Sequence, residues 1–62
     1  MIKQIIYVIL NEDNKFLNAV TKDGVFWTDF LKHAFLFEND MLAHRENKKV
    51  KGTVKRLNYS IN

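Results

Sequence analysis

The sequence contains no cysteine and no proline, and only two of its 62 residues are glycine. Without cysteine, the chain has no disulfide, no thiolate ligand for zinc and no cysteine nucleophile. Its longest unbroken apolar run covers residues 5–10, whereas a membrane-spanning helix needs about 20 residues. The first residues also lack the basic-then-apolar layout of a secretory signal, so we expect a cytoplasmic protein.

Groups for catalysis are scarce as well. The one serine, Ser60, lies near the end of the chain, and Gly24 and Gly52 stand too far apart to form a phosphate-binding loop. His33 and His44 would lie about 16 Å apart on a continuous helix, which is too far to share a metal ion. We therefore expect no enzymatic activity, no cofactor and no metal site.

The composition is typical of a single small globular domain over residues 1–62. Hydrophobic residues make up 47% of the chain and charged residues 27%. A domain of this size buries only about 60% of its unfolded surface, and it has little room for a ligand pocket of the usual ~300 Å³ or more. The large aromatic side chains of residues 26–37 are therefore expected mainly in the core.

Runs of β-branched and aromatic residues predict four strands. The predicted strands cover residues 2–10, 15–21, 25–27 and 50–59. The first strand is apolar on both faces, which favours a central position in the sheet. The polar residues 11–14 predict a turn that tolerates left-handed backbone angles. The pair Asp23-Gly24 predicts a tight hairpin turn with a positive φ angle.

The segment 28–47 contains neither glycine nor proline and carries apolar residues at helical spacing. One interpretation is a single helix over this whole segment. The other is a helical turn at 28–34, an extended piece at 35–37 and a second helix capped by Asn39 or Asp40. Periodicity alone favours the single helix, and both interpretations stay open at this point.

The element order is therefore β-β-β-α-β, an α+β fold. A three-stranded meander followed by a helical crossover would place the last strand beside the first and parallel to it. We expect a mixed sheet with strand order 4-1-2-3 and one helix, or a broken helix pair, on one face. The other face would be open, and a homodimer is one way to cover it.

Positive charge gathers in the second half of the chain. The net charge is +3, and residues 45–56 hold six lysines or arginines against one glutamate. One interpretation is a solvated sheet edge, where lysines prevent edge-to-edge aggregation. The other is a basic patch that meets phosphate or an acidic protein surface.

Tyr7 and Tyr59 are expected on neighbouring strands. With Ile5 and Ile9, Tyr7 is predicted on the sheet face away from the helix, near Lys51 and Lys55. Aromatic side chains among lysines on a sheet face resemble a platform for single-stranded nucleic acid, although ordinary packing or a protein interface would use them as well. The candidate partner-binding residues are Tyr7, Arg45, Lys48, Lys49, Lys51, Lys55, Arg56 and Tyr59.

The chain contains Tyr-Val-Ile-Leu-Asn-Glu-Asp-Asn-Lys-Phe-Leu at 7–17, Phe-Trp-Thr-Asp at 26–29, Ala-Phe-Leu-Phe at 34–37 and Met-Leu-Ala at 41–43. These segments, followed by a Val-rich end, resemble short uncharacterised proteins of phages and prophages of Gram-positive bacteria. The chain departs from that pattern at Asn14, where glycine is frequent, and at His44, where a small helical residue is usual. The resemblance implies a small non-enzymatic protein and favours the broken helix, with Phe37 as an anchor between two helical pieces.

Together these features predict a small non-enzymatic phage-type binding protein that inhibits or modulates a host or defence protein by occluding one of its surfaces. Anti-CRISPR-like inhibition is one form of this hypothesis. The alternative is a small basic nucleic-acid-binding protein that acts through its C-terminal strand, and a third interpretation is a subunit that only dimerises. The expected location is the cytoplasm of an infected or lysogenic bacterial host.

Overall fold

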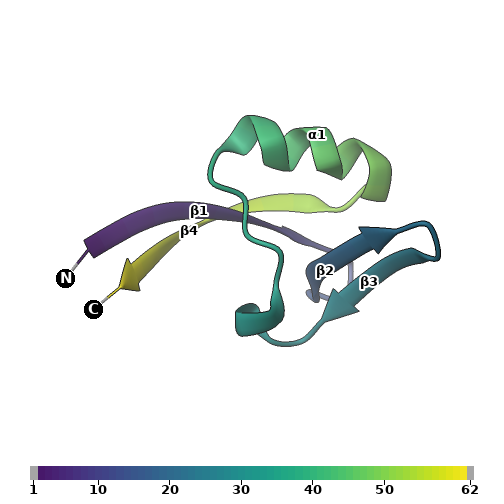
Figure 1. Cartoon of the computed structure of the whole chain (residues 1–62), viewed down its shortest axis with the longest axis horizontal. Coiled ribbons are helices and arrows are strands. Elements are labelled where there is room, and N and C mark those ends of the chain that lie inside the picture. The colour runs from purple at the N-terminus through teal and green to yellow at the C-terminus, as the bar shows by residue number, and fades with distance from the viewer. Residues whose placement is uncertain (1, 62) are drawn as a thin grey trace.

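The computed structural model describes residues 2–61, and the side chains of residues 4–58. Its elements are β1 (Ile2–Leu10), β2 (Phe16–Thr21), β3 (Gly24–Thr28), the 3-10 turn η1 (Leu31–His33), α1 (Asp40–Val50) and β4 (Thr53–Ile61). The strands form one antiparallel sheet in the order β3-β2-β1-β4. In Figure 1, α1 lies on one side of the β1–β4 ribbon, and the β2–β3 hairpin bends away to the other side. The predicted α+β fold and the central position of β1 are confirmed.

The predicted strand order 4-1-2-3 is the observed order counted from the other edge of the sheet. The prediction of a mixed sheet, with the last strand parallel to the first, is wrong. The order is β3-β2-β1-β4, in which each strand has the expected neighbours but β4 pairs antiparallel with β1 at nine consecutive positions. The reason is that the chain makes an additional pass before the helix begins. As a result α1 runs in the same direction as β1 (Figure 1), and the strand after α1 has to return against it.

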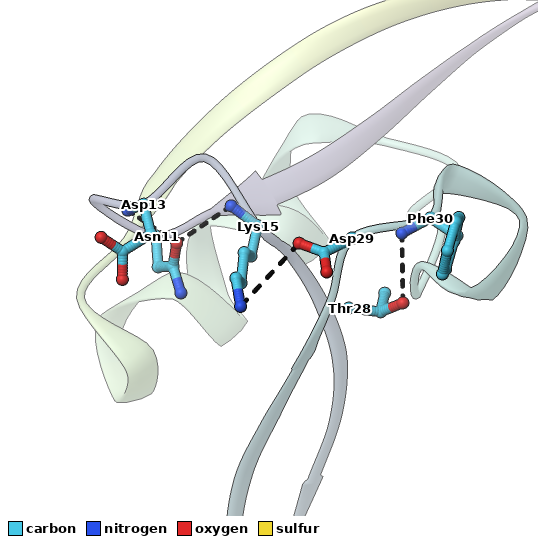
Figure 2. A network of polar contacts seen from close by, with 6 residues as sticks. All are labelled: Asn11, Asp13, Lys15, Thr28, Asp29 and Phe30. Atoms are coloured by element: carbon cyan, nitrogen blue, oxygen red, sulfur yellow. Dashed lines mark hydrogen bonds and ion pairs between the residues drawn. The ribbon is translucent and has the colours of Figure 1, made fainter.

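The two hairpin turns form as their residues predict. In the first turn, Asn11 Oδ1 accepts hydrogen bonds from the backbone N–H groups of Asp13 at 2.9 Å and Lys15 at 3.0 Å (Figure 2). Asn14 has a left-handed φ of 61°, which asparagine tolerates. In the second turn, Gly24 has a φ of 134°, a value that residues with a Cβ rarely adopt.

The segment 28–47 is broken, so the single-helix interpretation is wrong and the alternative is confirmed. Thr28 caps a turn rather than a long helix, since its Oγ1 accepts a hydrogen bond from Phe30 N at 3.2 Å (Figure 2). The chain then passes through η1 and an extended stretch before α1 begins. Asn39 caps α1 by accepting a hydrogen bond from Leu42 N at 2.9 Å. Because α1 continues to Val50, β4 begins three residues later than predicted.

Residues 35–37, which we call the wedge segment, fill a gap between β1 and β2. The two strands pair directly only at Leu10 and Phe16. Beyond that pair, Phe35 N donates to Leu17 O at 2.7 Å, while Phe37 and Tyr7 exchange two backbone hydrogen bonds of 2.9 Å. The wedge segment therefore satisfies backbone groups that a continuous β1–β2 ladder would have paired.

The core lies between α1 and the sheet. Ile9, Leu17, Phe37 and Ala43 form its buried cluster, and Tyr7, Trp27, Val50 and Val54 pack against it. Ile6 and Val8, on the alternate positions of β1, are also buried, so both faces of this strand are covered. The expectation that the aromatic residues are mainly core is only partly met, because Phe26, Phe30 and Phe35 are exposed. None of the helices in the described part of the chain has the length and apolar character needed to cross a membrane.

Candidate functional site

An apolar groove runs between β2 and α1, with the wedge segment as its wall. Its volume is about 250 Å³. The lining residues come from three separate parts of the chain: Leu17, Ala19, Val20, Phe35, Phe37 and Glu46. The groove exists because β2 leaves β1 after a single pair and the wedge segment enters between them.

The two phenylalanines of the wedge segment connect the groove to the core. Phe35 and Phe37 alternate with Leu36 along an extended backbone, so their side chains share one face. Their ring centroids are 4.8 Å apart and the rings are tilted by 45°. Phe37 is buried, whereas Phe35 is 52% exposed. The pair therefore presents an aromatic surface that is supported from beneath by the core.

Among the side chains that the structure describes, Glu46 is the one ionisable group that lines the groove. It lies on the helix face that carries Ala43 and Val50, three and four residues away, which pack in or against the core. Its side chain is 28% exposed, and Lys49 Nζ lies 3.7 Å from its Oε2. Lys49 is itself largely exposed, so the ion pair contributes little to stability and can open. An apolar groove with one carboxylate suits an apolar side chain of a partner, with a positively charged group of that partner close to Glu46.

Exposed apolar side chains are frequent on the described part of the molecule. The exposed large apolar residues in the described part of the chain are Ile5, Val20, Val25, Phe26, Phe30, Leu31, Phe35, Leu36, Met41 and Leu42. Scattered exposed apolar residues are ordinary, but a groove with apolar residues on its rim is typical of an interaction site. Val20 and Phe35 are the two exposed residues that also line the groove.

The structure places Tyr7 differently from the prediction. Tyr7 is half-buried and packs against the cluster that contains Ala43 of α1, so it lies on the helix side of the sheet. The expected position on the opposite face, near Lys51 and Lys55, is wrong. Tyr7 shares the helix-side face with Ile9, two residues further along β1, which is part of the same buried cluster. The backbone of Tyr59 pairs with Gln4, and its side chain lies outside the described residues.

The predicted basic residues are all exposed, but they do not form one surface. Arg45 and Lys48 lie one helical turn apart and line a shallow hollow of about 310 Å³ on α1. Lys49 lies beside Glu46, and Lys51 ends the helix with a left-handed φ of 56°. The adjacent strand residues Lys55 and Arg56 point to opposite faces of the sheet. The structure thus brings Arg45 and Lys48 together and distributes the others.

The sequence alone does not reveal the groove residues, because its pattern places each of them at an ordinary strand or helix position. One signal was present: Asn18 separates two apolar pairs in strand β2, which breaks the expected alternation. In the structure this is a β-bulge between Leu17 and Ala19, and Asn18 Nδ2 donates a 2.6 Å hydrogen bond to His33 O. The bulge changes the direction of β2 where the groove opens.

Among the residues that the structure describes, no three His, Cys, Asp or Glu side chains are grouped so that they could hold a metal ion. No family model, curated protein or solved structure matches this chain. The resemblance to short phage and prophage proteins therefore stays a prediction.

Proposed function

We propose that this chain is a small non-enzymatic phage-type binding protein that inhibits or modulates a host or defence protein by occluding one of its surfaces. Inhibition in the manner of anti-CRISPR proteins is one form of this activity. The proposed place of action is the cytoplasm of an infected or lysogenic bacterial host. The observation that carries the proposal is the apolar groove, with Val20 and Phe35 exposed at its rim.

The size of the molecule suits occlusion. A standard protein interface buries about 800 Å² on each partner, which is roughly a sixth of this chain's accessible surface of 4940 Å². Interface cores are enriched in aromatic side chains that fill or line pockets. Phe35, backed by the buried Phe37, is placed to act as such a residue. A partner side chain in the groove would then contact β2, α1 and the wedge segment together.

A binding experiment with two matched variants tests the proposal. Tagged protein is incubated with host lysate after nuclease treatment, and any captured protein is identified and its affinity measured with purified components. Val20→Glu introduces a charge at the groove rim, and Met41→Glu makes the same change on α1 at a side chain that is 74% exposed and does not line the groove. We expect Val20→Glu to weaken binding at least ~10-fold, because burying an unpaired charge is costly, while Met41→Glu leaves it unchanged.

Equal effects of the two variants, or a captured protein whose affinity neither variant changes, would exclude the groove as the binding site. Circular dichroism of both variants confirms that each remains folded. If the captured protein is an enzyme, such as a nuclease, its activity is then assayed with and without the purified chain. Occlusion predicts that saturating the enzyme with the chain abolishes the activity.

The second candidate function is direct nucleic-acid binding. It is favoured by the proximity of the two basic residues Arg45 and Lys48 on α1. Binding through phosphate contacts weakens with salt in proportion to the number of contacts, with a slope of about −0.7 per contact for single strands. We expect Arg45→Gln with Lys48→Gln to reduce that slope by about 1.4 if these residues contact phosphate. Titrations of a labelled oligonucleotide at several salt concentrations measure it. The C-terminal strand named in this hypothesis contributes Lys55 and Arg56, which point to opposite faces.

A further inference from the structure

The sheet ends at β3, and this edge differs from the edge at β4. β3 is the last strand of the order β3-β2-β1-β4, so one of its sides has no neighbouring strand. Its residues are Gly-Val-Phe-Trp-Thr, with no charge and no proline. At the other end, β4 carries Lys55 and Arg56. Charged residues on an edge strand oppose the addition of another strand, and β3 lacks this protection.

Backbone groups of β3 are directed outward. A two-residue loop, Lys22-Asp23, joins β2 to β3, so Thr21 and Gly24 face one another. Because N–H and C=O groups alternate in direction along an antiparallel strand, those of Val25 and Trp27 point away from β2. Apart from the hydrogen bonds within the sheet, no backbone bond of the described residues reaches Val25 or Trp27. These groups are in place to pair with an added strand.

Two carboxylates stand at the ends of this edge. Asp23 precedes β3 and Asp29 follows it, six positions apart, and both are exposed. Asp29 forms an ion pair with Lys15 at 3.8 Å (Figure 2). Both side chains are about half exposed or more, so a competing cation can replace Lys15. An apolar edge with a negative charge at each end is complementary to an apolar strand with a positive charge at each end.

A second copy of this chain fits the edge less well. Antiparallel pairing of β3 with β3 in the fully overlapped register centres on Phe26. That register sets Asp23 of one copy opposite Asp29 of the other, at both ends. Like charges directly opposite one another across two strands are destabilising.

We propose that the free edge of β3 is a strand-addition site for an extended apolar segment of another protein that carries a Lys or Arg at each end, six positions apart. The inference rests on the proposed function in that the ligand is a protein. The surface is distinct from the groove, so each can fail without the other. In the complex, the added strand pairs with the outward backbone groups of Val25 and Trp27, and its basic ends meet Asp29 and Asp23.

Peptide binding monitored at Trp27, the one tryptophan of the chain, tests the proposal. Three peptides are titrated: Lys-Thr-Val-Thr-Val-Thr-Lys, the same peptide with Glu at both ends, and the Lys-ended peptide with N-methyl groups on alternate residues. The full-length protein is used with the Asp23→Asn, Asp29→Asn double variant as the matched control. Analytical ultracentrifugation gives the oligomeric state of the free protein.

The proposal predicts that the Lys-ended peptide binds and changes the emission of Trp27. It predicts that the Glu-ended peptide binds about 2- to 30-fold more weakly, from two cross-strand ion pairs, and that the double variant removes this difference. Methylation of the amides that face β3 abolishes binding, because strand addition depends on those hydrogen bonds.

Equal binding of the methylated peptide, or no change of Trp27 emission at millimolar peptide, would overturn the proposal. The free protein could instead dimerise and lose peptide binding as its concentration rises. That result would show that a second copy of the chain occupies the β3 edge, and it would also overturn the proposal. If Val20→Glu still weakens capture of a host protein while all peptides fail, the groove proposal stands and the strand-addition site falls.

Discussion

The two edges of β1 are held in different ways. Along one edge, β1 pairs with β4 at nine consecutive positions. Along the other, it pairs directly with β2 at one position and with Phe37 of the wedge segment at another. The first edge is a continuous ladder, which resists opening along its length. The second is assembled from pieces that are distant in sequence, and the groove forms where those pieces meet.

In this chain of 62 residues, the regular edge of β1 contributes mainly to stability, and the irregular edge offers a surface for binding. A domain of this size has a total stability of only about 3–9 kcal/mol at the usual ~0.05–0.15 kcal/mol per residue. The β1–β4 ladder and α1 provide a supported side, while the β2 side leaves apolar residues such as Val20 and Phe35 exposed. Surfaces that bind partners are commonly built on such less regular segments.

Replacement of Phe37 by alanine gives the largest expected effect, because this side chain fills the junction between β1, β2 and α1. Removal of a buried phenylalanine costs about 3–5 kcal/mol, which is a large share of the total stability. Urea or thermal denaturation followed by circular dichroism measures the loss. The matched control is Phe35→Ala, for which we expect about 1 kcal/mol because half of that ring is already exposed. Equal losses for the two variants would show that the wedge segment is not a structural junction.

Replacement of Gly52 by alanine tests the close contact between residue 52 and the end of β1. A Cβ at this position would lie 2.5 Å from Leu10 O and 2.8 Å from Ile9 Cγ2. The backbone oxygen cannot move without disturbing the ladder, so we expect a loss of about 1–3 kcal/mol in the free energy of unfolding. The control is the neighbouring Lys51→Gly, expected to be neutral or stabilising because Lys51 has a left-handed φ of 56°. A Gly52→Ala protein as stable as the wild type would contradict the close packing of Gly52 against β1.

The smallest expected effect is a difference in amide hydrogen exchange between the two edges of β1. It compares the edges directly, within the intact protein. Tyr7 N–H bonds to Phe37 O, whereas its neighbours Ile6 and Val8 direct their amides toward β4. If the wedge segment opens locally without loss of the β1–β4 ladder, the Tyr7 amide exchanges at least ~10-fold faster than that of Val8. Amide exchange followed by NMR measures both in one experiment. Equal rates for the two amides would mean that the two edges open together.

Much of the local structure could be predicted from residue type. The apolar run Ile2–Leu10 forms a strand, Asp23-Gly24 forms a tight turn with positive φ at Gly24, and Asn39 caps a helix. Each of these features depends on neighbouring residues or on backbone preferences. The helix break at 34–39 was harder, since periodicity favoured one helix and only the resemblance favoured two pieces.

The candidate site could be predicted far less well. The proposed residues follow from charge and from an expected face of the sheet, and that face is wrong for Tyr7. The groove was not predicted because its lining joins residues 17, 35 and 46, which no periodic pattern relates. The basic residues were correctly expected on the surface, yet their separation into groups depends on the end of α1 and on the alternation of β4.

The sequence by itself therefore determined which segments become strands and where the hairpins turn, because these depend on side-chain preferences within a few residues. Only the tertiary structure decided the direction of β4, the side on which Tyr7 lies and the presence of the groove. These depend on backbone hydrogen bonds between distant residues, Phe35 with Leu17 and Phe37 with Tyr7. Backbone donors and acceptors are nearly identical in every residue, so the sequence carries little information about which distant ones will pair.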